Sequence, residues 1–426
     1  MPIPFLAQRQ RCLRALVALA TGDQWSWAER HWHARQIDRY FDDLATFERR
    51  MAKPNRRCTR RLRHSLLTGY SGALCAFLQE AGSRGIKRIK PQSPEQLEKF
   101  LRSACPARPL FEHAVIKTQT KANGEKRVTL SLGRKVRTAQ RLVSDVLEAS
   151  GVANPFDYSR AGKGREAAIA EIVRLVEEEG IRDFVIFDLA NYFTSVDAKH
   201  LKGVPLPKKV MRHAVMFNRH AILLHSGCTA TEAEAARHGL PQGARVSGLL
   251  ASTLLGRELR QLDGAMGIVT YVDDGVIGAC DPAGAKSLAE AIKLRFGNHH
   301  GGPLGFKKLD VHSIEQGIPF LGYWLRLDLL SELPKVTVRP SHEAREKFRR
   351  ELMRKLALTS PKPDWDTAIE VAHAYGKRWR AAFSHWQPDE AEIHEFEGKV
   401  EIFVGDFLSG FPGKHGLKPP VLACVG

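Results

Sequence analysis

The stretch Gly267-Ile-Val-Thr-Tyr271-Val272-Asp273-Asp274-Gly275-Val-Ile-Gly278 decides how this chain folds. Two runs of β-forming residues flank a tight turn, which is the pattern of a β-hairpin. The adjacent acids Asp273 and Asp274 would then lie at the hairpin tip. Taken alone, the stretch also fits an ordinary exposed turn, because Asp-Asp-Gly turns are common.

A third carboxylate follows a separate apolar run. Phe184-Val-Ile-Phe187 is typical of a buried central strand, and it ends in Asp188. If the fold directs Asp188 and the hairpin acids to one place, their mutual repulsion requires cations. Two Mg²⁺ ions about 3.5–4 Å apart would neutralise the acids, activate a 3′-hydroxyl and stabilise a leaving pyrophosphate.

Between these two elements lies the loop His238-Gly239-Leu240-Pro241-Gln242-Gly243-Ala244-Arg245-Val246-Ser247. Its glycines and proline fix the backbone, and Gln242 offers an amide that both donates and accepts hydrogen bonds. A helix is expected to begin directly after it. The loop therefore suits close approach by a base pair or a sugar.

In this order, the three elements resemble the palm of reverse transcriptases, and the resemblance runs from about Val115 to Trp386. It implies Asp188, Asp273 and Asp274 as catalytic residues, and these three with Leu189 as ligands of two Mg²⁺ ions, for which Mn²⁺ can substitute. Asp188-Leu-Ala-Asn-Tyr192-Phe193 resembles the first palm motif, in which the aromatic residue five positions after the Asp blocks a 2′-hydroxyl. The implied nucleotide-binding residues are Tyr192, Phe193, Gln242 and Gly243.

Cations for the triphosphate are expected on a second hairpin. Two β-rich runs from Val115 to Leu132 flank Asn123-Gly124, a strong hairpin signal. The resemblance assigns Arg127 and Lys121 of this hairpin to the triphosphate. It also assigns Lys308, or its neighbour Lys307, as the basic residue that protonates pyrophosphate. The irregular Gly301-Gly302-Pro303 segment leaves that last assignment open by one residue.

The resemblance also implies contacts with primer and template. Tyr158-Ser-Arg160-Ala-Gly-Lys-Gly-Arg165 is similar to the template-contacting segment of group II intron and retron-type enzymes, which assigns Arg160 and Arg165 to the template. Phe320-Leu321-Gly322-Tyr323 is similar to the hairpin that grips the primer end. One departure from the family is Gly248, which stands where proline often follows the serine of the Pro-Gln-Gly loop.

The chain is strongly basic, with 426 residues, 65 Lys+Arg against 47 Asp+Glu and a formal charge of +18. Basic residues are dense between Arg49 and His64, where no acid interrupts them. Either this is a solvated helix face or phosphates neutralise it, and we expect Arg56, Arg57, Arg60 and Arg61 to bind RNA. No apolar run is long enough for a membrane span, so we expect a cytoplasmic protein without a membrane partner.

The expected fold is α+β, a right-hand polymerase with fingers, a palm built on an antiparallel sheet, a helical thumb and a helical N-terminal extension. We place the basic extension at 1–100, the fingers at 101–183, the palm at 184–325, the thumb at 326–400 and a tail at 401–426. The seven cysteines are scattered without a C-x-x-C pair. They fit neither a disulfide framework nor a zinc finger.

We therefore predict an RNA-directed DNA polymerase, a nucleotidyltransferase that makes cDNA from dNTPs on a noncoding RNA template. Tyr375 to Phe383 resembles the last thumb helix of group II-like bacterial enzymes, and the roughly forty residues after it are too few for a ribonuclease H or HNH domain. The chain is thus most similar to the unknown-group, defence-associated antiphage reverse transcriptases of bacteria. The alternative is a group II intron-type maturase, an RNA-binding splicing cofactor. Phe193 disfavours an RNA-dependent RNA polymerase, and the three acids disfavour a degenerate enzyme. The template, the priming mechanism and the oligomeric state stay open.

Overall fold

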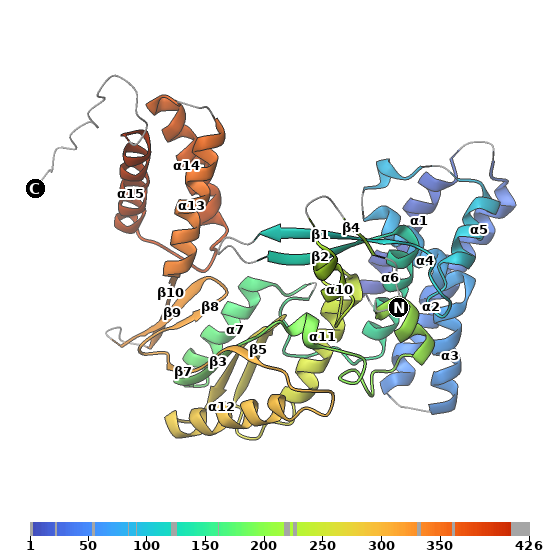
Figure 1. Cartoon of the computed structure of the whole chain (residues 1–426), viewed down its shortest axis with the longest axis horizontal. Coiled ribbons are helices and arrows are strands. Elements are labelled where there is room, and N and C mark those ends of the chain that lie inside the picture. Colours follow the sequence, from blue (N-terminus) through green and yellow to red (C-terminus); the bar gives the residue numbers. More distant parts are fainter. Residues whose placement is uncertain are drawn as a thin grey trace, which may run out of the picture.

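The structure, a computed structural model, describes residues 3–21, 24–52, 56–83, 85–90, 92–120, 126–160, 162–216, 222–224, 228–329, 334–359 and 363–409. Helices of the N-terminal part form one side of the molecule (Figure 1). They are α1 (Ile3–Leu19), α2 (Trp27–Ala52), α3 (Arg56–Thr68), α4 (Tyr70–Gly82), the short 3₁₀ helix η1 (Ile86–Arg88) and α5 (Pro94–Ser103). α4 is buried from Gly72 to Gln79 and is the centre of this layer. In α5, Ser93 and Gln96 form a capping box.

The predicted second hairpin is present as β1 (Ala114–Thr120) and β2 (Lys126–Leu132), which pair in antiparallel register from Ala114↔Leu132 to Thr120↔Lys126. Its tip, residues 121–125, lies outside the described residues. A short strand from later in the chain, β4 (Ile222–Leu224), pairs parallel to β1 and completes the sheet order β2-β1-β4. In Figure 1 the hairpin points from the N-terminal helices toward the C-terminal helices.

The palm sheet has the order β5-β6-β3-β7, and all its neighbours are antiparallel. Its strands are β3 (Asp183–Leu189), β5 (Gly267–Tyr271), β6 (Asp274–Ala279) and β7 (Phe306–Ser313). Side chains of β3 alternate between two cores. Val185 and Phe187 lie in the main core with α11 (Arg245–Leu259) and α12 (Pro282–Gly297), and Phe184 and Ile186 lie in a second core with α7 (Arg165–Glu177).

The C-terminal part begins with a small sheet of order β10-β9-β8, followed by three helices. These elements are β8 (Ile318–Phe320), β9 (Tyr323–Asp328), β10 (Lys335–Pro340), α13 (His342–Thr359), α14 (Trp365–Ala381) and α15 (Glu390–Ser409). The helices have a core of their own around Phe348, Leu352 and Val404. In Figure 1 they stand apart from the N-terminal helices, across the palm sheet.

The remaining helices of the described chain are α6 (Arg134–Ala149), α8 (Tyr192–Ser195), α9 (Lys208–Val210), the π-helix η2 (Met211–Val215) and α10 (Ala230–Ala235). The main core runs without interruption from the N-terminal helices through α6 into α11, with Leu74, Val143 and Leu254 among its buried members. The expected boundaries at residues 100 and 325 fall inside α5 and β9. No helix in the described part of the chain has the length and apolar character to cross a membrane.

Candidate active site

The predicted acidic hairpin forms with a two-residue turn, Val272-Asp273, between the paired residues Tyr271 and Asp274. Val272 has φ of 62°, a left-handed conformation that a β-branched residue rarely adopts. Such a residue costs on the order of 1–3 kcal/mol and persists where the surroundings fix it. Here the backbone N–H of Leu189 donates to the carbonyl of Asp273 at 3.2 Å, which ties the turn to the end of β3.

Asp188 lies between the acidic hairpin and β7. It pairs with Asp274 on β6 and with Lys308 on β7 across the sheet. Burial raises the pKa of the Asp274 carboxyl to about 7, and the nearby charges of Asp188 and Asp273 add to the effect, while Lys307 and Lys308 oppose it. The strand ends therefore concentrate negative charge that a bound cation would stabilise.

A cavity of about 540 Å³ opens at these strand ends. It brings together seven residues predicted from the sequence, namely Asp188, Leu189, Tyr192, Phe193, Gln242, Asp273 and Lys307, the alternative to Lys308. Asp274 and Gly243 are not among its lining residues. Residues that sequence reasoning missed complete the wall, including Val128, Leu130, Asn191 and His238. Asn191 adopts φ of 49°, a left-handed conformation that Asn tolerates better than most residues. The Asn two residues before Phe193 is therefore a sequence signal for a turn at this position.

The Pro-Gln-Gly loop connects the fingers to the first palm motif. Gly239 has φ of 70°, and a Cβ there would lie 2.4 Å from the carbonyl oxygen of Phe193. The next residue, Leu240, donates its N–H to that same oxygen at 2.6 Å. On the other side, the N–H of Leu130 in β2 donates to the Gln242 carbonyl at 2.9 Å. Glycine is thus required for the close approach that fixes Phe193 at the cavity.

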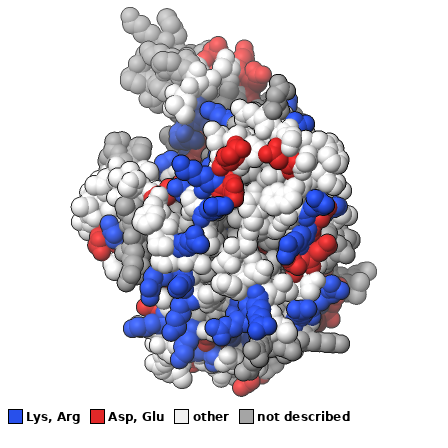
Figure 2. All heavy atoms as spheres, turned by 90° about the vertical axis from the view of Figure 1, so that its right-hand side faces the viewer, with Lys and Arg blue, Asp and Glu red and all other residues white. Residues whose placement is uncertain are grey.

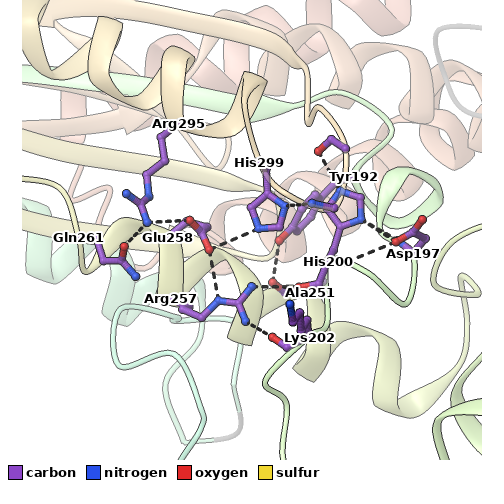
Figure 3. Close-up of polar contacts among 12 residues, drawn as sticks. Tyr192, Asp197, His200, Lys202, Ala251, Arg257, Glu258, Gln261, Arg295 and His299 are labelled. Carbon is purple, nitrogen blue, oxygen red and sulfur yellow. Dashed lines mark hydrogen bonds and ion pairs between the residues drawn. The ribbon is translucent and has the colours of Figure 1, made fainter. Parts of the chain in front are cut away.

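The two aromatic residues of the first motif differ in their surroundings. Tyr192 is buried, and its hydroxyl donates to the Ala251 carbonyl at 2.8 Å (Figure 3). Burial also raises the pKa of this phenol. Phe193 is half-buried, with its ring centroid 6.3 Å from that of Tyr192. The Tyr192 hydroxyl is therefore committed to α11, and the Phe193 ring borders the open cavity.

A polar cluster beside Tyr192 holds the loop that leads into β7 (Figure 3). Buried Glu258 contacts Arg295 at 2.9 Å and His299 at 3.5 Å. His200 stacks on His299, with centroids 5.0 Å apart, and its Nε2 lies 3.0 Å from the carbonyl oxygen of Gly302. Three residues later, the carbonyl of Gly305 accepts from the N–H of Ala190 at 2.9 Å. These contacts fix the start of β7 against the first motif.

Lys307 and Lys308, the two candidates for the basic residue near the triphosphate, both lie at the start of β7 but contact different acids. The sheet register between β3 and β7 shifts at Asp188/Leu189, so that Lys307 falls at an irregularity. Its Nζ lies 3.4 Å from the Asp188 carboxylate, and Lys307 lines the cavity. Lys308 instead has its Nζ 3.8 Å from Asp310. The structure thus brings Lys307 to the cavity and places Lys308 beside it.

The three carboxylates offer the hard oxygen ligands that Mg²⁺ prefers, and the raised pKa of Asp274 indicates a site that lacks compensating charge. Among the residues that the structure describes, no group of three His, Cys, Asp or Glu side chains is close enough together to hold a metal ion. The donor chemistry fits a divalent cation, and the side chains would have to close around it.

The residues expected to contact primer and template lie around α7 and β8–β9. Phe320 and Tyr323 are buried and flank a turn in which Leu321 and Gly322 have φ of 50° and 83°. Burial raises the pKa of the Glu148 carboxyl, and the half-buried Arg160 is one of the arginines whose charge opposes that rise. The guanidinium of Arg165 stacks on Tyr323 at 4.9 Å, so the structure places Arg165 against the C-terminal part.

The basic helix α3 lies on the face that Figure 2 presents, where Lys and Arg side chains gather in several groups. Arg60 and Arg61 are exposed, and among the described residues no acid pairs with them or with Arg63. Burial, and then the charge of Arg60, lower the pKa of Arg63. Lys121 and the side chains of Arg56, Arg57 and Arg127 lie outside the described part of the structure.

Comparison with known proteins identifies the central part of the chain. Residues 117–325 match the family described as reverse transcriptase (RNA-dependent DNA polymerase). This match confirms the predicted palm fold in a mixed α+β chain and the predicted class of enzyme, a nucleotidyltransferase. No curated protein matches the sequence.

Solved structures show only distant likeness. A Candida tropicalis apo telomerase truncated from its C-terminal domain has 13% identity and a TM-score of 0.37, covering 55% of this chain and 56% of that one. An insertion-loop deletion mutant of the RNA-dependent RNA polymerase of a human picobirnavirus has 13% identity and a TM-score of 0.38, covering 70% and 64%. The apo telomerase of Candida tropicalis has 13% identity and a TM-score of 0.38, covering 71% and 62%. The chain spans 56–64% of the length of these structures.

Proposed function

We propose that this chain, whose residues 117–325 form a reverse transcriptase domain, copies RNA into cDNA in the cavity at the palm strand ends. One observation carries the proposal. Asp188, Asp273, Phe193 and Gln242 come from three separate segments of the sequence, and all four line the same cavity of about 540 Å³. That volume falls in the range of about 300–1,000 Å³ typical of ligand sites, and a dNTP would fit it.

In this cavity different residues would contact different parts of a bound dNTP. Phe193 lies where its ring would exclude a ribose 2′-hydroxyl, and Gln242 would border the base or sugar. Lys307, with Lys308 beside it, supplies positive charge near Asp188 for the triphosphate and for protonation of pyrophosphate. Arg127 and Lys121 of the β1–β2 hairpin are proposed as further triphosphate ligands, and Gly243 as part of the nucleotide-facing loop.

We propose two Mg²⁺ ions, replaceable by Mn²⁺, held by Asp188, Asp273, Asp274 and the carbonyl of Leu189. When bound, such ions activate the primer 3′-hydroxyl and stabilise the charge that develops on pyrophosphate. The chain's own contribution is to hold the carboxylates in place. The backbone hydrogen bond from the N–H of Leu189 to the carbonyl of Asp273 fixes two of the proposed ligands relative to each other.

The nucleic acid would run from the basic N-terminal helices past the cavity to the C-terminal helices. We assign the extension to residues 1–100, the fingers to 101–183, the palm to 184–325, the thumb to 326–400 and a tail to 401–426. Arg160 and Arg165 are proposed for the template, Phe320 to Tyr323 for the primer end, and Arg56, Arg57, Arg60 and Arg61 for RNA phosphates. The unpaired charge of Arg60 and Arg61 supports the last assignment.

The biological role is proposed from the sequence resemblance to unknown-group bacterial enzymes. In that reading the template is a noncoding RNA, the enzyme works in the cytoplasm and the cDNA serves antiphage defence. The exposed charge of α3 also favours a second candidate, a maturase that binds intron RNA and assists splicing. Sequencing the nucleic acids that copurify with the expressed protein separates the two, because only the first predicts DNA complementary to a bound RNA.

A primer-extension assay tests the polymerase proposal itself. A DNA primer is annealed to an RNA template or to a DNA template of the same sequence, and each receives dNTPs or rNTPs with Mg²⁺. We expect the fastest extension for the RNA template with dNTPs. Extension that prefers rNTPs would reject the assignment of Phe193 as the sugar gate, and no extension under any of the four conditions would reject the proposed activity.

A further inference from the structure

The first turn of α7 contacts the C-terminal part of the chain through two charged residues. The guanidinium of Arg165 lies 4.9 Å from the ring centroid of Tyr323 and 4.8 Å from that of Phe383, so it stacks against both. It also donates a hydrogen bond to the backbone carbonyl of Ala382. Arg165 is thus engaged at a joint between the palm and the thumb helices.

Glu166 is the centre of this joint. Its Oε2 accepts hydrogen bonds from the Tyr323 hydroxyl and from Ser384 Oγ, each at 2.7 Å. Its Oε1 accepts from Arg165 at 2.8 Å. The Nε2 of His385 lies 2.9 Å from the backbone carbonyl oxygen of Glu166. One carboxylate therefore joins α7 to two segments that lie 157 and 218 residues further along the sequence.

The same contacts fix the turn expected to hold the primer end. Tyr323 is 0% exposed, so its ring is unable to reach a primer, and its hydroxyl is held from behind by Glu166. The carbonyl of Gly322 in the turn accepts from the N–H of Ser341 at 2.8 Å, just before α13 begins. Leu321 and Gly322, both at positive φ and half-buried, are then more accessible than Phe320 and Tyr323 on either side of them.

We infer that Glu166 is a positioning residue that holds the primer-grip turn and the thumb as one unit, and so sets how long a primer–template stays bound. This rests on the proposed function, because it takes the β8–β9 turn as the primer grip. Glu166 is not among the residues that line the nucleotide cavity. Its loss should therefore shorten the residence time of the primer–template without changing the chemical step.

The control for Glu166 is Glu179, which has a similar side-chain exposure, 38% against 37%, and a similar partner, Arg174 at 2.7 Å. Glu179→Gln removes the same charge, and no contact of the C-terminal helices involves this residue among those described. Glu166→Gln loses the ion pair with Arg165 but keeps an acceptor oxygen. Glu166→Ala loses every side-chain contact, and Tyr323→Phe loses one hydroxyl.

The measurement is the dissociation rate of a preannealed DNA primer on an RNA template, together with kcat and KM for a single dNTP. A tenfold change in dissociation corresponds to about 1.4 kcal/mol, close to the net contribution of one charge-assisted hydrogen bond. We expect dissociation to be about tenfold faster for Glu166→Ala and about threefold faster for Glu166→Gln and Tyr323→Phe. With a trap for released enzyme, products should shorten in proportion, while kcat and KM of the two Glu166 variants stay within about twofold of wild type.

A double-mutant cycle separates positioning from general destabilisation. Glu166→Ala and Tyr323→Phe remove the two ends of one hydrogen bond, so their effects on dissociation should be less than additive. Thermal unfolding of each variant is measured in parallel. Tyr323→Phe removes a single hydroxyl and is the mildest of the set, so it keeps the test valid if Glu166→Ala unfolds.

The inference fails if Glu166→Gln and Tyr323→Phe release the primer–template at the rate of Glu179→Gln. It fails as well if faster release is accompanied by an equal fall in kcat, because the joint would then act on the palm as a whole. Binding is measured without catalysis. A wild-type protein that binds the primer–template but never extends it would therefore reject the proposed function, while the binding comparison still tests Glu166.

Discussion

The palm cavity and the basic helix α3 are built in opposite ways. The cavity collects side chains from β2, β3, the Pro-Gln-Gly loop, the β5–β6 turn and the start of β7, which lie far apart in the sequence. Burial, and then the charges of Asp188 and Asp273, raise the pKa of the neighbouring Asp274 carboxyl to about 7. α3 is a run of 13 residues whose exposed arginines lie on a single helix. The proposed chemistry requires convergence of distant segments, whereas the proposed RNA binding requires only charge on a local surface.

This contrast implies that the two properties can be removed separately. None of the residues that line the cavity belongs to the N-terminal helices. Variants of the cavity should therefore lose synthesis and keep RNA binding, and variants of α3 should do the reverse.

The largest effect is expected at the carboxylates. Changing Asp273 and Asp274 together to Ala, or Asp188 to Ala, should lower dNTP incorporation by at least about a thousandfold, because charge that holds the metal is lost. Folding and RNA affinity should change little, since burial of like charges does not stabilise the palm. Glu290→Gln, at an exposed site on α12, is the matched control in primer-extension and filter-binding assays. Full incorporation by the double variant would reject the two-metal assignment.

The next effect concerns selection of the sugar. Phe193→Ala should reduce the preference for dNTPs over rNTPs by about 10- to 100-fold, because it opens space beside the 2′ carbon without removing a carboxylate. The ratio of kcat/KM for the two substrates is the measurement. Phe193→Tyr keeps the bulk of the ring and should keep the preference. An unchanged ratio in Phe193→Ala would show that another residue is the gate.

A smaller effect should follow at α3. Replacing Arg56, Arg57, Arg60 and Arg61 by Gln should weaken binding of unrelated RNAs by about tenfold, and each lost phosphate contact should make the slope of log K against log salt shallower by about 0.7–0.9. Extension of a short preannealed primer–template should survive.

A charge-matched control removes four lysines from the palm side, Lys208, Lys209, Lys286 and Lys293, all of them exposed. If the α3 variant and this control have equal affinity and equal salt slope, α3 is only a solvated face. The separation of the two regions would then fail on the binding side.

The smallest effect tests the convergence itself. Gly239→Ala should destabilise the protein by about 1–3 kcal/mol, because its φ of 70° is strained for alanine and its Cβ would meet the Phe193 carbonyl. Gly248→Ala, in the first half of α11 with open space around the added Cβ, should be neutral or stabilising by up to about 1 kcal/mol. Urea unfolding of both variants gives the comparison. Equal stability would indicate that the Pro-Gln-Gly loop is loosely packed.

Much of the active site could be predicted from the sequence because its signals are local. The apolar run before Asp188, the β-rich runs around Asp273 and the Asn123-Gly124 hairpin each specify an element within about ten residues. The expectation that these elements lie together in space came from their resemblance to the palm of reverse transcriptases. The family match of residues 117–325 confirms the enzyme class, and the assignments of individual residues stay predictions.

Other features depend on contacts that no local pattern encodes. Lys307 reaches the cavity because the β3–β7 register shifts at Asp188/Leu189. The Tyr192 hydroxyl donates a hydrogen bond to α11, and the Arg165 guanidinium stacks on Tyr323 and Phe383. These partners lie 59 to 218 residues away in the sequence. The parallel pairing of β4 with β1 joins segments more than one hundred residues apart. These contacts depend on how segments distant in the sequence pack against each other.

The most direct test follows a single round of synthesis on enzyme that already holds RNA. Wild-type protein and Asp188→Ala are each bound to an RNA template with an annealed DNA primer, and one dNTP is added with Mg²⁺ or with a chelator. Metal-dependent synthesis that requires Asp188 predicts one templated deoxynucleotide for the wild type with Mg²⁺, none with the chelator and none for Asp188→Ala, at equal RNA occupancy. Incorporation by Asp188→Ala at the wild-type rate would contradict it, as would a fully RNA-bound wild type that adds nothing with Mg²⁺.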